Sequence, residues 1–124
     1  MAKYLVAAAC GLVSLVAACA APPPLGVAIP ITNVNSIAGK WQGTIYYQGS
    51  SSAGTLAVNP DRTWVGTGFG KQSHGTFTLV SGEAQWHSLT TGASGTWVLR
   101  NVNGVTVLNG RGSNGVTFEE KRPG

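Results

Sequence analysis

From residue 39 to the C-terminus, apolar and polar residues alternate with period two in short runs. Alternation of this kind predicts β-strands that have one buried and one exposed face. We find no window with the apolar spacing of an amphipathic helix. The eight predicted strands are residues 40–47, 54–58, 63–69, 75–80, 84–89, 95–102, 105–111 and 116–121. The fold class is therefore predicted to be all-β.

Turn-forming residues separate these runs. Residues 59–62 (Asn-Pro-Asp-Arg) predict a tight turn, because proline presets φ and asparagine caps the turn with its side chain. Asn103-Gly104 predicts a type I′ hairpin, which needs positive φ at both positions. Residues 48–52 and 70–74 are predicted to be polar turns. Short connections throughout indicate an antiparallel up-and-down meander.

A flat meander would leave two strand edges open to aggregation, and closure into a barrel removes both. We therefore expect a small barrel of about eight strands, and a half-open β-sandwich is the alternative. Two glycines inside the third run, Gly66 and Gly68, suggest a bend or bulge. A Gly-Thr-apolar theme at strand openings, as in residues 54–56 and 75–77, predicts glycines that reverse the chain and large residues that plug the interior.

Four tryptophans compete for the inside of this small barrel: Trp41, Trp64, Trp86 and Trp97. We expect them to form a filled core rather than a roomy cup. A less favoured interpretation leaves Tyr46, Trp64 or Trp86 exposed, where an aromatic ring could stack against a sugar or a partner protein.

The stretch before the strands has a different character. Residues 22–24 are three prolines, which favour an extended and stiff segment. Leu25, Val27, Ile29 and Ile31 then alternate with smaller residues, which is a strand-like pattern that Pro30 would confine to a sheet edge. We expect part of this segment to lie along the barrel.

The N-terminus has the layout of a secretory signal peptide. A short basic start, residues 1–3, precedes an apolar run, residues 4–18, that ends in small residues. The alternative is an uncleaved transmembrane helix, since residues 4–21 carry no charge. The richness of the run in alanine and glycine, and the prolines that follow it, favour the signal peptide, which is expected to be helical.

Residues 15–19 (Leu-Val-Ala-Ala-Cys) resemble a bacterial lipobox. The resemblance implies cleavage between Ala18 and Cys19 and attachment of acyl chains such as palmitate to Cys19. It also implies an outer-membrane location, facing the periplasm, because the following residue, Ala20, is not the aspartate that retains lipoproteins in the inner membrane. The predicted organisation is a signal peptide at 1–18, a lipidated N-terminus and proline-rich tether at 19–35, and a barrel domain at 36–124.

Residues 37–41 (Ile-Ala-Gly-Lys-Trp), followed by a meander, are similar to the Gly-x-Trp opening of calycin-type barrels, which include lipocalins and avidins. The resemblance implies that Trp41 packs under a basic side chain from the last strand and so closes one barrel end. The matching position is Arg122, which shares strand parity with Val116 and Phe118. Glu120 falls on the same strand face.

The distribution of charged residues, cysteines and histidines excludes several classes of function. The eight basic residues exceed the four acidic ones, but they are scattered, which argues against a nucleic-acid partner. Both cysteines lie in the first nineteen positions, so the barrel domain has no disulfide, thiolate metal site or cysteine nucleophile. His74 and His87 are expected at the surface, and no third ligand accompanies them at a recognisable spacing, so we predict no metal and no cofactor.

Catalytic groups are also missing from the pattern. Glu119 and Glu120 are neighbours on one strand, so they face opposite ways and cannot act as a facing acid–base pair. No Gly-x-Ser-x-Gly elbow is present. We therefore expect a non-enzymatic binding or structural module of the cell envelope, with a membrane anchor and an envelope protein as candidate partners. The alternatives are an inhibitor of an exported protease or lysozyme-type enzyme, and a carrier of a small apolar ligand.

Overall fold

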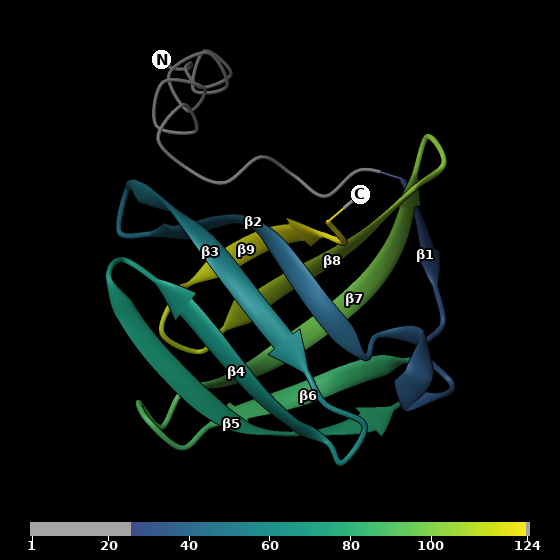
Figure 1. Cartoon of the computed structure of the whole chain (residues 1–124), viewed down its shortest axis with the longest axis horizontal. Helices are drawn as coiled ribbons and strands as arrows, with labels where there is room; N and C mark the ends of the chain where they lie inside the picture. Colours follow the sequence, from purple (N-terminus) through teal and green to yellow (C-terminus); the bar gives the residue numbers. More distant parts are fainter. Residues whose placement is uncertain (1–25, 124) are drawn as a thin grey trace, which may run out of the picture.

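The computed structural model describes residues 26–123 (Figure 1). In this range the chain forms nine strands and one short 3-10 turn: β1 Val27–Ile29, η1 Val34–Ser36, β2 Gly39–Tyr47, β3 Ser50–Val58, β4 Thr63–Gly68, β5 Lys71–Val80, β6 Glu83–Ser88, β7 Ser94–Val102, β8 Val105–Gly112 and β9 Thr117–Lys121. The all-β prediction is confirmed. The predicted signal peptide, the start of the tether, and both Ala18 and Cys19 lie outside the described residues.

Strands β2 to β9 form one closed antiparallel barrel. Each strand pairs with the next along the chain, β9 pairs with β2, and β7 and β8 pair over the whole length of their hairpin. Figure 1 shows the strands curling around a common interior. The predicted up-and-down barrel is confirmed, and the half-open sandwich is wrong, because no edge of the eight-stranded ring is left open.

Two of the predicted polar turns are shorter than expected. The β2–β3 and β4–β5 connections contain only Gln48-Gly49 and Phe69-Gly70, and all four residues have positive φ, between 51° and 78°. The polar residues beside these turns continue the strands. The sequence pattern did not predict them as strand residues, because this end of the barrel does not enclose a packed core and its inward positions are therefore not consistently apolar.

Other turn predictions hold. At Asn103-Gly104 the φ values are 52° and 86°, as the hairpin requires. At residues 59–62 the Arg62 N–H donates to the Asn59 carbonyl at 3.0 Å. The predicted bulge at Gly66 and Gly68 is wrong, because the pairing of β3 with β4 runs unbroken from Gly54 opposite Gly68 to Val58 opposite Trp64.

The segment before the barrel runs along it, as expected. β6 pairs only with the first half of β7, and β1 pairs antiparallel with the second half of the same edge, with Ala28 opposite Arg100. Beyond Pro30 the chain turns, and the Ile31 N–H donates to the Gly82 carbonyl at 2.7 Å. The edge position of β1 agrees with the proline that follows it, which could not donate a ladder hydrogen bond.

The barrel therefore has two different ends. We call the end that carries η1 and the β3–β4, β5–β6 and β7–β8 turns the closed end, and the end that carries the other four connections the mouth. Ile31 and Ile37, which flank η1, are fully buried against the barrel core. In Figure 1 the closed end lies on the right, where η1 is drawn in blue. The N-terminal segment thus supplies the plug of one end only.

Candidate binding cup

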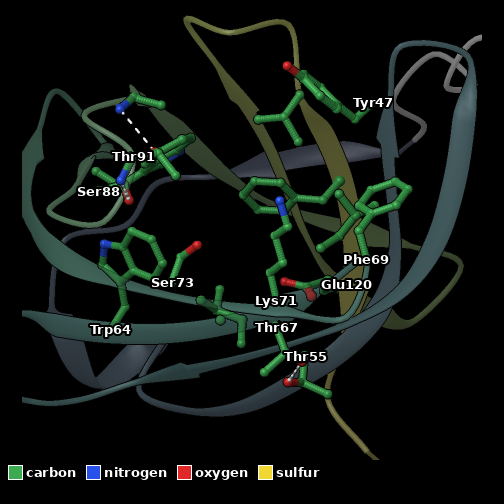
Figure 2. A pocket seen from close by; sticks show the side chains of 18 of the residues that line it. Tyr47, Thr55, Trp64, Thr67, Phe69, Lys71, Ser73, Ser88, Thr91 and Glu120 are labelled. Carbon is green, nitrogen blue, oxygen red and sulfur yellow. Dashed lines mark hydrogen bonds between the residues drawn. The ribbon is translucent and has the colours of Figure 1, made fainter.

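The mouth half of the barrel contains a cavity of about 290 Å³ (Figure 2). Its apolar lining includes Ile45, Tyr47, Trp64, Trp86, Trp97 and Phe118, and its polar lining includes Lys71, Ser73, Thr91, Asn114 and Glu120. We call this cavity the cup. The expectation of a filled core is wrong for this half of the molecule, although the four tryptophans do point inward.

Glycines occupy inward positions of two strands beside the cup. The inward positions of β3 and β4 near the mouth carry Gly54, Gly66 and Gly68. A Cβ on Gly54 or Gly68 would collide with Ile45, whose side chain crosses the space beside them. At Gly66 a Cβ would find its nearest neighbour, the Thr55 carbonyl oxygen, 3.4 Å away. Gly66 therefore opens directly onto the cup.

Tryptophan rings form a second wall of the cup. Trp64 meets Trp86 edge to face with ring centroids 5.9 Å apart, and it meets Trp97 at 6.2 Å. Edge-to-face contacts of this kind hold aromatic rings in fixed orientations. Trp64 and Trp86 are 7% and 6% exposed, so the exposed stacking interpretation is wrong for these two residues.

The rings lie over glycines of neighbouring strands. A Cβ on Gly75 would come within 2.8 Å of the Trp64 ring, and one on Gly95 within 2.7 Å of the Trp86 ring. Gly54 and Gly75 both lie in the middle of their strands and do not reverse the chain. Gly75 and Gly95 of the Gly-Thr-apolar theme therefore make room for tryptophan rings, and Gly54 makes room for Ile45, which corrects the expectation that these glycines form turns.

Two of the four indole N–H groups are hydrogen-bonded and two are not. Trp41 Nε1 donates to the Ile37 carbonyl at 2.9 Å, and Trp64 Nε1 donates to the Thr76 carbonyl at 3.1 Å. Trp86 Nε1 and Trp97 Nε1 are buried without a hydrogen-bond partner in the described part of the chain. A buried donor without an acceptor costs about 1–3 kcal/mol. Both unpaired indoles belong to the cup.

Glu120 is the acidic group of the cup. It lies on β9 between Gly43 of β2 and Leu108 of β8, and it is only 2% exposed. Within residues 26–123 its carboxyl group forms no hydrogen bond and no ion pair. Desolvation by burial raises the pKa of Glu120 to about 7. At neutral pH the carboxyl is therefore divided between its protonated and ionised forms.

Lys71 is the basic group that borders the same cavity. It is the first residue of β5, beside the β4–β5 turn, and it is exposed to solvent near Phe69 at the mouth. Figure 2 shows Lys71 and Glu120 on the same side of the cavity. The cup therefore combines aromatic walls, one buried acid and one solvated base at its rim.

Trp41 and Arg122 come together at the closed end, away from the cup. The Arg122 guanidinium carbon lies 4.4 Å from the centroid of the Trp41 ring. Its nitrogens also donate to the backbone carbonyls of Ala38, at 3.1 Å, and Ser36. A cation over a tryptophan face is attracted by the ring's negative π cloud. The pair thus fastens the start of β2 to the end of β9.

Both histidines are exposed, as expected. His74 Nδ1 lies 3.2 Å from the Thr90 hydroxyl, and His87 Nδ1 lies 2.9 Å from the Ser94 hydroxyl. Among residues 26–123 we find no group of three or more histidine, cysteine, aspartate or glutamate side chains that could hold a metal ion. The described part of the chain also contains no helix with the length and hydropathy needed to span a membrane.

Sequence reasoning missed Glu120 as a site residue and missed the cup itself. One signal was present, because strand parity puts Glu120 on the inward face beside Phe118. An acid at an inward position, combined with glycines at inward positions of two neighbouring strands, indicates a polar cavity rather than a packed core.

Comparison of the chain with known protein families, with curated proteins and with solved structures finds no match. A function for this protein therefore has to be argued from the geometry of the cup and from the sequence.

Proposed function

We propose that this protein is a lipid-anchored binding protein of the bacterial envelope that holds a small, largely apolar ligand in the cup. The observation that carries the proposal is the cavity of about 290 Å³ with its tryptophan wall. Pockets for small ligands start at about 300 Å³ and are lined mainly by apolar and aromatic side chains, with a few polar groups that orient the ligand. At about 290 Å³ the cup lies at the lower limit of this size range, and its lining agrees with the description.

The composition of the wall supports a binding role over a packing defect. Gly66 faces the cup with room for a Cβ, although a glycine within a strand costs about 0.5–1 kcal/mol relative to alanine. The cup also holds a buried carboxyl group and two unpaired indole donors. These features destabilise an empty barrel, and a bound ligand would offset part of that cost.

The arrangement of polar groups favours binding over catalysis. A serine or threonine nucleophile is commonly activated by a base within hydrogen-bond distance. Ser73 and Thr91 border the cup, but within residues 26–123 no histidine or carboxylate is hydrogen-bonded to either hydroxyl. We therefore retain the non-enzymatic interpretation.

The anchor is proposed from the lipobox-like residues 15–19. Acyl chains on Cys19 would hold the protein in the outer membrane, since two or more chains give stable attachment. Residue 26 enters the described structure at the closed end, beside Asn101 and Val102. Residues 19–25 extend at most about 25 Å. A lipid at Cys19 would therefore keep the closed end near the bilayer and leave the mouth facing away from it.

Two measurements test this proposal. Mass spectrometry of the N-terminus isolated from cells should find a fragment that begins at Cys19 and carries acyl chains, and a bare sulfur would remove the anchor.

For the cup, 3-phenylpropanol is titrated into the full chain held in phosphatidylcholine nanodiscs, while tryptophan emission is recorded. We expect a saturable change that Gly66→Leu abolishes, because the new side chain fills the cup. The matched control is Val65→Leu, on the outward face of the same strand, which should leave the titration unchanged. A wild-type titration without saturation would contradict ligand binding.

A further inference from the structure

We infer that the cup selects a small organic amine, whose apolar body lies among Trp64, Trp86 and Trp97 and whose ammonium group is held by Glu120. The inference rests on the proposed binding function and adds the chemical class of the ligand. Three observations lead to it: the missing partner of the Glu120 carboxyl, the aromatic surroundings, and the distribution of charge around the cavity.

The carboxyl group of Glu120 needs a partner. Glu120 is 2% exposed, and within residues 26–123 no side chain forms a hydrogen bond or an ion pair with its carboxyl group. A buried, unpaired carboxylate is strongly unfavourable, and a cation with a hydrogen-bonding N–H removes most of that penalty. A wholly apolar ligand would bury the acid further without giving it a partner.

The walls of the cup also favour a cation over an anion. Phe118 lies two residues before Glu120 on the same inward face of β9, and its ring centroid is 6.3 Å from that of Trp86. Aromatic faces attract cations by about 0.5–2 kcal/mol, more when water is excluded. An ammonium group held by Glu120 would therefore approach aromatic surface as well as the carboxylate.

The charged groups around Glu120 are few. On the neighbouring strands its register partners are Gly43 and Leu108, neither of which titrates. The titratable residues that border the cup besides Glu120 are Tyr47 and Lys71, both near the mouth. Lys71 is exposed, so water and salt screen its repulsion of a cationic ligand. A carboxylate ligand would gain Lys71 at the rim but would meet Glu120 inside.

Binding of an amine should also depend on pH in a defined direction. The pKa of Glu120 is about 7, so the carboxylate form increases between pH 6 and pH 8. A primary alkylamine stays protonated through this range, as lysine does. Amine binding should therefore strengthen as the pH rises, whereas binding of a neutral analogue should not change.

The test compares three probes that share a phenyl ring with a three-carbon chain: 3-phenylpropylamine, 3-phenylpropanol and 3-phenylpropanoate. Each is titrated into the full chain in phosphatidylcholine nanodiscs at pH 6 and pH 8, with tryptophan emission as the readout and empty nanodiscs as the blank. At pH 8 we expect the amine to bind at least tenfold more tightly than the alcohol, and the carboxylate to bind most weakly. Between pH 6 and pH 8 the amine should gain about fivefold.

Two variants locate the effect. Glu120→Gln keeps the shape of the side chain and should abolish the preference for the amine over the alcohol. Glu119→Gln, the matched control on the outward face of the same strand, should change amine binding by less than twofold.

The possible results separate the inference from the proposed function. Saturable alcohol binding with no preference for the amine would overturn the inference and leave the function standing. If none of the three probes saturates, the binding function itself fails. If Glu120→Gln does not fold, the pH comparison on the wild-type protein decides, because a pH-independent preference for the amine would exclude Glu120 as its partner.

Discussion

The two ends of this barrel use the same kind of residue for opposite results. At the closed end, Trp41 is 1% exposed, its indole N–H is hydrogen-bonded, and Arg122 covers its ring. In the mouth half, Trp86 and Trp97 leave their indole donors unpaired and border a cavity. A tryptophan therefore makes either a solid core or a cup wall, according to what faces it.

The facing residues differ in bulk. Ile31 and Ile37 from the N-terminal segment fill the closed end. The mouth half has Gly66 and other glycines at its inward positions, and its cavity is bordered by residues of the connecting loops, such as Thr91 and Asn114. The plug therefore comes from outside the eight strands. In this barrel the closed end is the one where an additional segment brings its own apolar side chains.

Truncation of a tryptophan should destabilise the barrel more at the closed end than in the mouth half. Trp41→Ala should lower the free energy of unfolding by about 3–5 kcal/mol, because it leaves a large void and removes the platform of Arg122. Trp86→Ala should cost about 1–2 kcal/mol less, since that ring already borders a cavity. Urea denaturation followed by circular dichroism on a water-soluble Cys19→Ser chain that starts at residue 19 measures both. Equal losses would contradict the distinction between the ends.

A second effect comes from Glu120 and depends on pH. Its pKa is about 7 in the folded state, above the ordinary value of 4.5, so the folded protein holds its proton more tightly than the unfolded chain does. Stability from this group is fully present below pH 4.5 and is lost as the pH rises through 7, by about 3 kcal/mol in total. Glu120→Gln should remove this dependence. The free energy of unfolding is measured by urea denaturation between pH 4.5 and pH 8 on the same Cys19→Ser background. The same pH dependence in both proteins would exclude burial of the acid.

The smallest effect concerns the glycines. Gly66→Ala should raise the free energy of unfolding by about 0.5 kcal/mol, because the new methyl group finds ordinary contacts and the unfolded chain loses freedom. It should also weaken binding of 3-phenylpropanol. Gly75→Ala is the matched comparison, and it should destabilise the barrel, since its Cβ would collide with the His87 backbone and the Trp64 ring. Thermal denaturation measures the sign of each change.

Much of the fold follows from the sequence because period-two alternation and turn chemistry are local signals. Asn103-Gly104 needs positive φ at both positions and predicts its own hairpin, and Pro30 predicts an edge position for the strand before it. The closed end was partly accessible too. Strand parity and the calycin resemblance put Arg122 with Trp41, and the two side chains are in contact in the structure.

The cup was only partly accessible. Strand parity puts Glu120 on the inward face, but the cavity depends on which glycines face inward and on what lies across from them. Gly66 was interpreted as a bend, and Gly75 as a turn, since a glycine in a strand carries no side-chain signal of its own. Glu120 was excluded as a catalytic partner of Glu119 on sound grounds, but its burial depends on strands that lie far away in the sequence. The pairing of β9 with β2 and β8 is needed to show that Gly43 and Leu108 lie beside Glu120 and that neither can pair with its carboxyl group.

The most direct test of a solid end and an open cup uses the four indole N–H groups as reporters. In a ¹H–¹⁵N spectrum of the Cys19→Ser chain, the indole signals are assigned by single tryptophan-to-phenylalanine variants and followed as 3-phenylpropanol is added. We predict saturable shifts for Trp64, Trp86 and Trp97, and an unchanged signal for Trp41. Equal shifts for all four signals, or no shift for any, would contradict a binding cup confined to the mouth half of the barrel.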